Sequence, residues 1–424
     1  MALKSINNLL KHQLISKSLI ASIDQAILSG LNFFISILLI KTVPKVEYGY
    51  YSIALPISLF IVSVQNAIVN APFTVLLVTK KDDKKKRYVA SLGLGQFLLI
   101  IPAVCMGLLA CTFLQHFGFN STQTAIVAAV SLAAIGLLSR EFMRTYFFAA
   151  EKPLQVLKLD VFYVIFFFAA IMLIYFLNKI SVPWIFLLIG FSGLLVSLYF
   201  SRYSNWKYQK QDVKESYREN WQYGKWSLLG VLVTHIQSYS YLYLLGLFLG
   251  SVAVADVSAS RLLLMPLILA QAGWGKIIIP YGSQLREKRQ NMLFFKLQFL
   301  ASIMFVVITI SYITVLMFFS VKIKNFFSEK YANVFDYIIL WGIIFILNFI
   351  FLNASYSLQV LKKFDIITKA NFITMLITLT CAYYLIKHDG ITGGLIALII
   401  GGSSLALLLW FYFGKIVLFS SKKN

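Results

Sequence analysis

The sequence predicts an all-α polytopic membrane protein in which twelve transmembrane helices form two six-helix lobes. Three observations support this fold class. Of the 424 residues, 59% are hydrophobic and only 13% are charged, and the mean hydropathy is +0.80. Twelve apolar runs are each long enough to cross a bilayer as a helix. The basic residues are concentrated in alternate connections between these runs.

The twelve runs are expected to be helices rather than strands. In chain order they lie near residues 19–42, 49–79, 88–115, 120–147, 156–178, 181–202, 222–250, 252–281, 293–321, 333–361, 365–386 and 390–414. Backbone polar groups in lipid must form hydrogen bonds within the protein, which only helices and closed barrels achieve. The runs are too long and too continuously apolar for barrel strands.

The distribution of Lys and Arg predicts the orientation of the chain. The N-terminal tail, the alternate connections and the C-terminal tail hold 29 of the 38 Lys and Arg residues, including those of KKDDKKKR at 80–87. The opposite connections hold seven, and the remaining two lie inside one apolar run. Both termini are therefore expected to be cytoplasmic. Most of the net charge of +22 is then an orientation signal, and no nucleic-acid partner is expected.

Five segments follow from the runs and the connections between them. They are an N-terminal basic interfacial segment (1–18), an N-lobe (19–202), a cytoplasmic linker (203–221), a C-lobe (222–414) and a cytoplasmic tail (415–424). When the first half of the sequence is shifted by 206 residues onto the second half, Ser52 aligns with Ser258 and Gln65 with Gln271. This alignment indicates a weak internal repeat. Two halves with the same orientation indicate a parallel repeat with a cavity between them.

The run from Val257 to Gly282 contains two cations, Arg261 and Lys276. A cation at hydrocarbon depth costs about 2.5–3.5 kcal/mol on insertion scales, and such residues usually face a wet cavity or the interior of a bundle. On one continuous helix the two would lie about 22 Å apart and within about 60° of one face. The sequence therefore predicts a cationic substrate-binding stripe. Arg261 is the stronger candidate for binding an anion, because a guanidinium binds phosphate oxygens bidentately.

Polar side chains recur at helical spacing on several of the other runs. The candidate cavity-lining residues are Gln25, Ser29, Asn32, Asn66, Asn70, Gln237 and Gln271. For any single residue, hydrogen bonding between helices is the simpler interpretation, at about 0.6 kcal/mol per contact. The stripes together favour a hydrated cavity.

Two titratable residues are candidates for a gate or for proton coupling. Asp24 lies about 8 Å inside the first helix, a depth similar to that of Lys276, so the two could form an ion pair where the lobes meet. That pair could be a permanent packing contact or a gate. His235 could titrate near neutral pH or simply bond to a neighbouring helix. Arg140, Glu141 and Arg144 are expected to form an ion-pair cluster at the cytoplasmic surface.

The sequence contains no signature of catalysis. It has no P-loop, no nucleophile elbow and no Cys/His cluster with metal spacing. No enzymatic activity, metal or cofactor is therefore expected.

The segment DQAILSGLNFFISILLIKTVPKVEYGYYSIALPI (24–57) resembles a known family. Small and polar residues follow the first helix, a short outer turn comes next, and Tyr48 and Gly49 open the second helix. This segment resembles the opening of the bacterial polysaccharide repeat-unit flippases, the O-antigen translocases of the multidrug/oligosaccharidyl-lipid/polysaccharide exporter superfamily. The 6+6 layout, the chain length and the short loops extend the resemblance over the whole chain.

The resemblance implies a V-shaped exporter in the bacterial cytoplasmic membrane, with helices one, two, seven and eight around the cavity. Such proteins flip a polyprenyl-pyrophosphate-linked oligosaccharide to the outer leaflet, among membrane lipids and alongside a polysaccharide polymerase and a chain-length regulator. In related peptidoglycan-precursor flippases, cavity arginines receive the pyrophosphate, and Arg261 lies on the matching helix eight. This chain has no arginine on helices one and two, where those flippases have more, which argues against the peptidoglycan precursor.

Two alternatives stay open at this stage. A multidrug or cation exporter of the same superfamily would be expected to place acids in its cavity, whereas this chain offers Arg261, Lys276 and one acid, Asp24. A membrane sugar polymerase would be expected to have a sizeable extracytoplasmic loop carrying acids, and every outer connection here is short.

Overall fold

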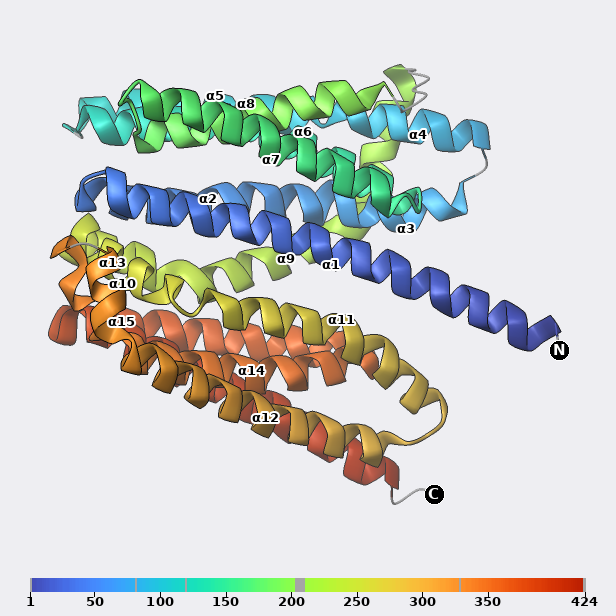
Figure 1. The fold of residues 1–424 in the computed structure, drawn as a ribbon. Helices are drawn as coiled ribbons and strands as arrows, with labels where there is room; N and C mark the ends of the chain where they lie inside the picture. The colour runs from blue at the N-terminus through green and yellow to red at the C-terminus, as the bar shows by residue number, and fades with distance from the viewer. Residues whose placement is uncertain (1, 81, 119, 203–209, 328, 422–424) are drawn as a thin grey trace. The chain divides into compact units, whose positions relative to one another are not determined.

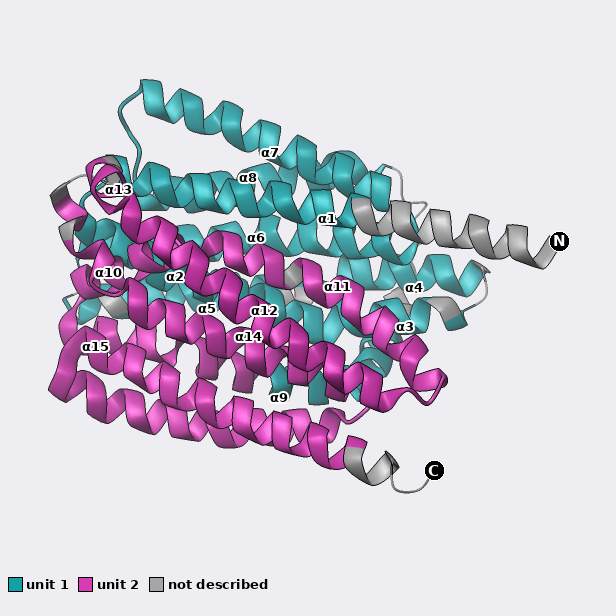
Figure 2. Ribbon diagram, turned by 60° about the horizontal axis from the view of Figure 1, so that its bottom comes forward, with its two compact units in different colours: residues 1–231 teal, residues 232–424 magenta. Residues whose placement is uncertain are grey.

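The computed structural model describes residues 2–80, 82–118, 120–202, 210–327 and 329–421, and the described elements are all helices (Figure 1). Among these residues, ten helices are long and apolar enough to cross a membrane, or eleven if the bent pair α10 and α11 is one span. The fold class predicted from the apolar runs is therefore confirmed as all-α. The chain divides into two compact units, residues 1–231 and 232–424 (Figure 2).

Unit 1 contains the first eight α-helices and the start of the ninth. They are α1 (Ala2–Thr42), α2 (Lys45–Gln65), the π-helical η1 (Asn66–Asn70), α3 (Ala71–Thr79), α4 (Asp82–Gly95), α5 (Phe97–His116), α6 (Ser121–Ala149), α7 (Pro153–Phe176), α8 (Val182–Ser201) and α9 (Lys210–Leu249). The expected interfacial segment is, from Ala2 on, the first part of α1. Of the expected linker, residues 210–221 are helical, and 203–209 lie outside the described residues.

The core of unit 1 is organised by α6, which packs against α2, α5, α7 and α8. Gly136 of α6 lies close to Gly190 and Gly193 of α8. A Cβ atom at Gly136 would lie 1.7 Å from the carbonyl oxygen of Gly190, so only glycine fits there. Small residues that let backbones approach are the usual means of helix packing in membranes. This tight pair holds α6 in place, and with it the arginines on its C-terminal half.

Unit 2 contains the rest of α9 and the later helices. They are α10 (Ser251–Leu262), α11 (Met265–Glu287), α12 (Asn291–Phe318), α13 (Ser320–Phe327), the 3₁₀-helical η2 (Glu329–Phe335), α14 (Ile338–Val360) and α15 (Phe364–Ser421). Helix α14 packs between α12 and α15, and Phe305 stacks on Phe349 with ring centroids 4.3 Å apart. Residues 422–424 of the expected tail lie outside the described residues.

Helix α15 covers two of the predicted runs, 365–386 and 390–414. It is 58 residues long, and its one non-helical residue is Gly390, with φ 60° and ψ −130°. Side chains disfavour a positive φ, so glycine is the residue that allows the chain to turn here. The segment is therefore two helices joined at Gly390, which is consistent with the twelve expected runs.

The predicted single helix over 252–281 is wrong. The chain breaks between Leu262 and Met265, and α10 and α11 are bent by 55° relative to each other. The cause is Pro266 in the first turn of α11, because proline lacks a backbone N–H and disfavours helical geometry in the residue before it. Arg261 and Lys276 are therefore on different helices, and they do not form the continuous stripe that the sequence predicted.

Candidate functional site

The break at Pro266 places Arg261 in the last turn of α10. The guanidinium lies next to the hydroxyl groups of Tyr239 and Tyr241, both on α9. It also lies over the ring of Trp341, 5.6 Å from the centroid, at the start of α14. No ion pair joins Arg261 to an acid in the part of the chain that the structure describes. Its positive charge is therefore stabilised by neutral groups only.

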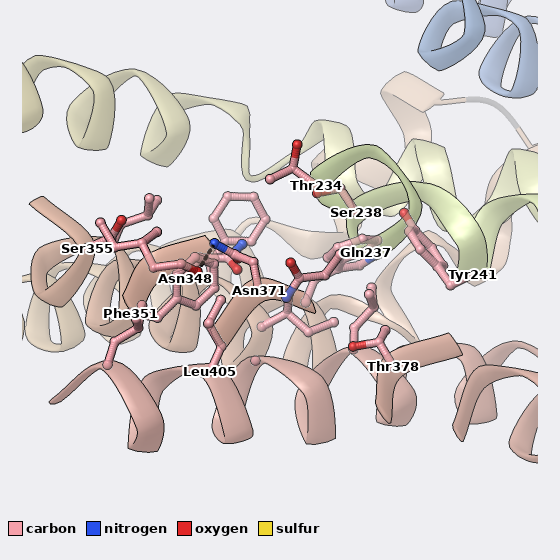
Figure 3. Close-up of a pocket in the computed structure, with 18 of the residues that line it drawn as sticks. Thr234, Gln237, Ser238, Tyr241, Asn348, Phe351, Ser355, Asn371, Thr378 and Leu405 are labelled. Atoms are coloured by element: carbon pink, nitrogen blue, oxygen red, sulfur yellow. Dashed lines mark hydrogen bonds between the residues drawn. The ribbon is translucent and has the colours of Figure 1, made fainter. Parts of the chain in front are cut away.

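Arg261 lines a cavity of about 410 Å³ inside unit 2 (Figure 3). The polar lining residues are Thr234, Gln237, Ser238, Tyr241, Arg261, Trp341, Asn348, Ser355, Gln359, Asn371 and Thr378. They come from α9, α10, α14 and α15, and no Asp or Glu is among the lining residues. The nearest acid in sequence, Asp256, lies on α10 but does not line the cavity. The cavity is therefore polar with a single charge, and that charge is positive.

The predicted residues of unit 2 are only partly brought together. Gln237 lines the cavity with Arg261, and its amide donates to the hydroxyl of Thr374 at 2.8 Å. Lys276 is exposed on α11 and Gln271 is buried there, and neither lines the cavity. His235 is 2.9 Å from the hydroxyl of Tyr243, a residue of its own helix. Asn348, Ser355 and Gln359 of α14 line the cavity and form a polar stripe at helical spacing in the sequence. The sequence did not single out Asn371 and Thr378 of α15, because one helix alone does not show which of its faces meets another.

In unit 1, the polar residues predicted on α1 lie on a different face from Asp24. Gln25 and Asn32 are exposed and Ser29 is partly buried, whereas Asp24 is only 2% exposed. The side chains of Asn66 and Asn70 bond to each other, at 2.6 Å, within η1.

The buried face of α1 belongs to a charge cluster in unit 1. Arg144 of α6 contacts Asp24 at 2.9 Å, Asp160 of α7 at 2.7 Å and Glu141 at 2.9 Å. A second arginine, Arg140, lies 3.4 Å from Asp160. Asp160 is fully buried, so two arginines and three acids share one desolvated site. Burying charged groups is tolerable only when they are paired in this way.

This cluster corrects one prediction. Arg140 and Arg144 were expected at the cytoplasmic surface, but Arg140 is only 8% exposed and both arginines bind buried acids, so they do not belong to the orientation signal. Within unit 1, Asp24 pairs with Arg144, and its expected pairing with Lys276 of unit 2 stays a prediction. The sequence missed Asp160, although an acid near the start of an apolar run was a visible signal.

Comparisons with solved structures identify the fold. A multidrug resistance MATE family transporter of the MOP superfamily, in an inward-facing conformation, matches with a TM-score of 0.76 at 12% identity, over 93% of this chain and 95% of that one. The lipid II flippase MurJ matches with a TM-score of 0.73 at 17% identity, over 96% and 90%. The chain has the fold of a MOP superfamily transporter. No protein-family model and no curated protein matches the sequence.

A third match shows that sites differ within this fold. A MOP superfamily transporter from Pyrococcus furiosus, whose binding pocket is reported to have reverse polarity, matches with a TM-score of 0.62 at 13% identity, over 96% of each chain. Multidrug transporters and a lipid II flippase thus share one architecture. A fold does not fix the ligand, so the function has to be argued from the chemistry of the site.

Proposed function

We propose that this protein flips a polyprenyl-pyrophosphate-linked oligosaccharide, an O-antigen or similar surface-polysaccharide repeat unit, across the bacterial cytoplasmic membrane to the periplasmic leaflet. The observation that carries this proposal is the environment of Arg261. Its charge has no acidic partner among the described residues, and it lines a polar cavity that contains no Asp or Glu. Such a site favours an anion, because a guanidinium forms strong, charge-assisted hydrogen bonds with phosphate oxygens.

The physical needs of such a substrate agree with the fold. Its sugars and pyrophosphate are polar and require a wet, cationic route, whereas its polyprenol tail is apolar and can stay in lipid. Proteins built from repeated helical halves commonly transport by alternating access around a site near the bilayer centre. In this proposal both termini are cytoplasmic, Lys276 adds a second cation along the route, and a polysaccharide polymerase and a chain-length regulator act on the flipped product.

The charge cluster of unit 1 is the candidate for coupling transport to an ion gradient. Its three acids outnumber its two arginines, and Asp160 lies within hydrogen-bonding reach of Asp24. Two adjacent carboxyl groups of this kind can share one proton. In this proposal Asp24, as a member of this cluster, is the first candidate for the coupling, and His235 of unit 2 is the second.

The function is tested by replacing Arg261 in cells that lack the chromosomal copy. We expect Arg261→Ala to lower surface-polysaccharide display at least about tenfold, because a hydrogen bond to a charged group contributes about 1.5–3 kcal/mol. Lipid-linked repeat units should accumulate on the cytoplasmic side, and Arg261→Lys should restore part of the display. The control is Arg218→Ala, which removes an exposed arginine of α9.

The same cells separate this function from the runner-up, a multidrug or cation exporter. Wild-type display by Arg261→Ala, at normal protein abundance, would contradict the proposal. Loss of resistance to cationic dyes in the deletion strain, with polysaccharide display unchanged, would instead support the exporter.

A further inference from the structure

The cavity of unit 2 contains more hydrogen-bonding capacity than an anion alone requires. Besides Arg261, its wall carries the amide side chains of Gln237, Asn348, Gln359 and Asn371. Figure 3 shows polar side chains from α9, α14 and α15 converging on the same space. These four amides come from α9, α14 and α15, whereas Arg261 is on α10. The cavity is therefore suited to a ligand with several neutral polar groups as well as an anionic one.

Two of the wall groups lack partners within the part of the chain that the structure describes. The indole Nε1 of Trp341 is buried without a hydrogen-bond acceptor, and Trp341 as a whole is only 2% exposed. The amide of Asn348, two turns further along α14, has no hydrogen bond either. A buried polar group without a partner costs about 1–3 kcal/mol. A ligand that accepts from Trp341 would remove that cost, and the half-buried amide of Asn348 offers it a second hydrogen bond.

The apolar part of the wall and the size of the cavity restrict the ligand further. Phe345, Phe351 and Leu405 line the same space as the amides. Small-molecule sites typically have about 300–1,000 Å³, mostly apolar walls and a few well-placed polar groups, and this cavity has about 410 Å³. A polyprenol chain could not satisfy the amides, and an organic cation would meet Arg261 without a compensating acid.

We infer that this cavity is a subsite for the sugar ring that is joined to the pyrophosphate of the substrate. With the pyrophosphate on Arg261, the adjoining ring lies among Gln237, Asn348 and Asn371, and one of its oxygens accepts from the indole N–H of Trp341. The faces of the ring contact Phe345 and Phe351. This inference rests on the proposed function, since it deepens the specificity of the same site.

The test compares two lipids on the full-length protein in nanodiscs. The probes are polyprenyl pyrophosphate and the same lipid carrying a single N-acetylhexosamine, and the measurement is the Kd of each. We expect the wild type to bind the sugar-bearing lipid about tenfold more tightly. Asn348→Leu and Trp341→Phe should each reduce that preference about two- to tenfold, as expected for one lost hydrogen bond. Asn348→Leu should leave the Kd of the lipid without sugar unchanged.

Two controls separate the sugar subsite from the anion site and from general damage. Trp184→Phe makes the same substitution at an exposed tryptophan of α8 in unit 1 and should leave both Kd values unchanged. Arg261→Ala should raise the Kd of both lipids by the same factor. Thermal unfolding of each variant checks the fold, and Asn348→Leu still tests the subsite if Trp341→Phe is unstable, because Asn348 has no internal bond to lose.

The outcomes distinguish this inference from the proposed function. Equal Kd values for the two lipids in the wild type, or an unchanged preference in Asn348→Leu, would overturn the sugar subsite. If Arg261→Ala still raised the Kd of the lipid without sugar, the proposed flippase function would stand even though the sugar subsite had been overturned. Failure of the wild type to bind either lipid would overturn both.

Discussion

Two arginines in this protein show how the same side chain takes opposite roles. Arg144 is bonded to three acids, and two of these, Asp24 and Asp160, are almost completely buried. Arg261 lies beside two tyrosine hydroxyls and an aromatic ring, and no ion pair joins it to an acid among the residues that the structure describes. A guanidinium whose acceptors are all carboxylates of the same unit holds helices together. A guanidinium without acids can bind the phosphate oxygens of a ligand.

This difference predicts a large loss of stability when Arg144 is removed. Arg144→Leu leaves Asp24, Asp160 and Glu141 with Arg140 as the one remaining cation of the cluster. Breaking a buried ion pair from one side typically costs about 3–5 kcal/mol. We expect a clear drop in the thermal unfolding temperature in detergent, measured by intrinsic fluorescence.

A second substitution should reverse part of that loss. Asp24→Asn removes one of the stranded charges, so the double variant should be more stable than Arg144→Leu alone, a non-additive result expected for residues in contact. The control is Arg202→Leu, because Arg202 is exposed and lies over the ring of Tyr199. Additive losses in the double variant would show that Asp24 and Arg144 do not act together.

At the scale of elements, the break between α10 and α11 decides what Arg261 can reach. The turn leaves the carbonyl of Leu263 without a helical partner, and the hydroxyl of Tyr312 on α12 donates to it at 2.9 Å. A backbone group freed inside a membrane protein has to be paired again by a neighbouring helix. The 55° bend is therefore supported from both sides, by Pro266 and by Tyr312.

Replacing Pro266 should reduce the bend. Pro266→Ala restores a backbone N–H and removes the constraint on the preceding residue. Spin labels are attached to cysteines at positions 252, near the start of α10, and 283, near the end of α11, in a background without the native cysteines. They report the distance between the two helix ends that lie farthest from the bend. A fully straight helix would lengthen this distance by about 5 Å at about 1.5 Å per residue.

The same variant connects the bend to function. If the bend between α10 and α11 is reduced, Arg261 moves away from Trp341, and binding of polyprenyl pyrophosphate should weaken. An unchanged label distance, with unchanged lipid binding, would show that the bend depends on packing and the bond from Tyr312 rather than on proline.

At the scale of the whole molecule, the charge distribution predicts the orientation in the membrane. Arg140 and Arg144 are explained by buried acids, yet the basic connection at 80–87 and the tails still carry far more Lys and Arg than the opposite connections. Basic connections remain on the cytoplasmic side. Asp83 and Lys179 belong to opposite sets and lie just outside apolar runs.

Orientation is checked by labelling intact cells with a membrane-impermeant maleimide. In a background without Cys105, Cys111 and Cys381, we expect Lys179→Cys to be labelled and Asp83→Cys to be protected until the cells are permeabilised. Labelling of Asp83→Cys in intact cells would invert the proposed orientation, and with it the direction of transport.

The sequence by itself determined the helical membrane class, because twenty apolar residues in a row have no other stable state in lipid. It also singled out Arg261, since the cost of a cation in an apolar run is a local property. Only the tertiary structure decided which charges are satisfied. Arg140 and Arg144 were expected at a surface, but packing of α7 against α1 and α6 brings them together with Asp160 in one buried cluster. The cavity around Arg261 likewise needed the structure, because its wall joins side chains from α9 and α15 that lie more than 130 residues apart.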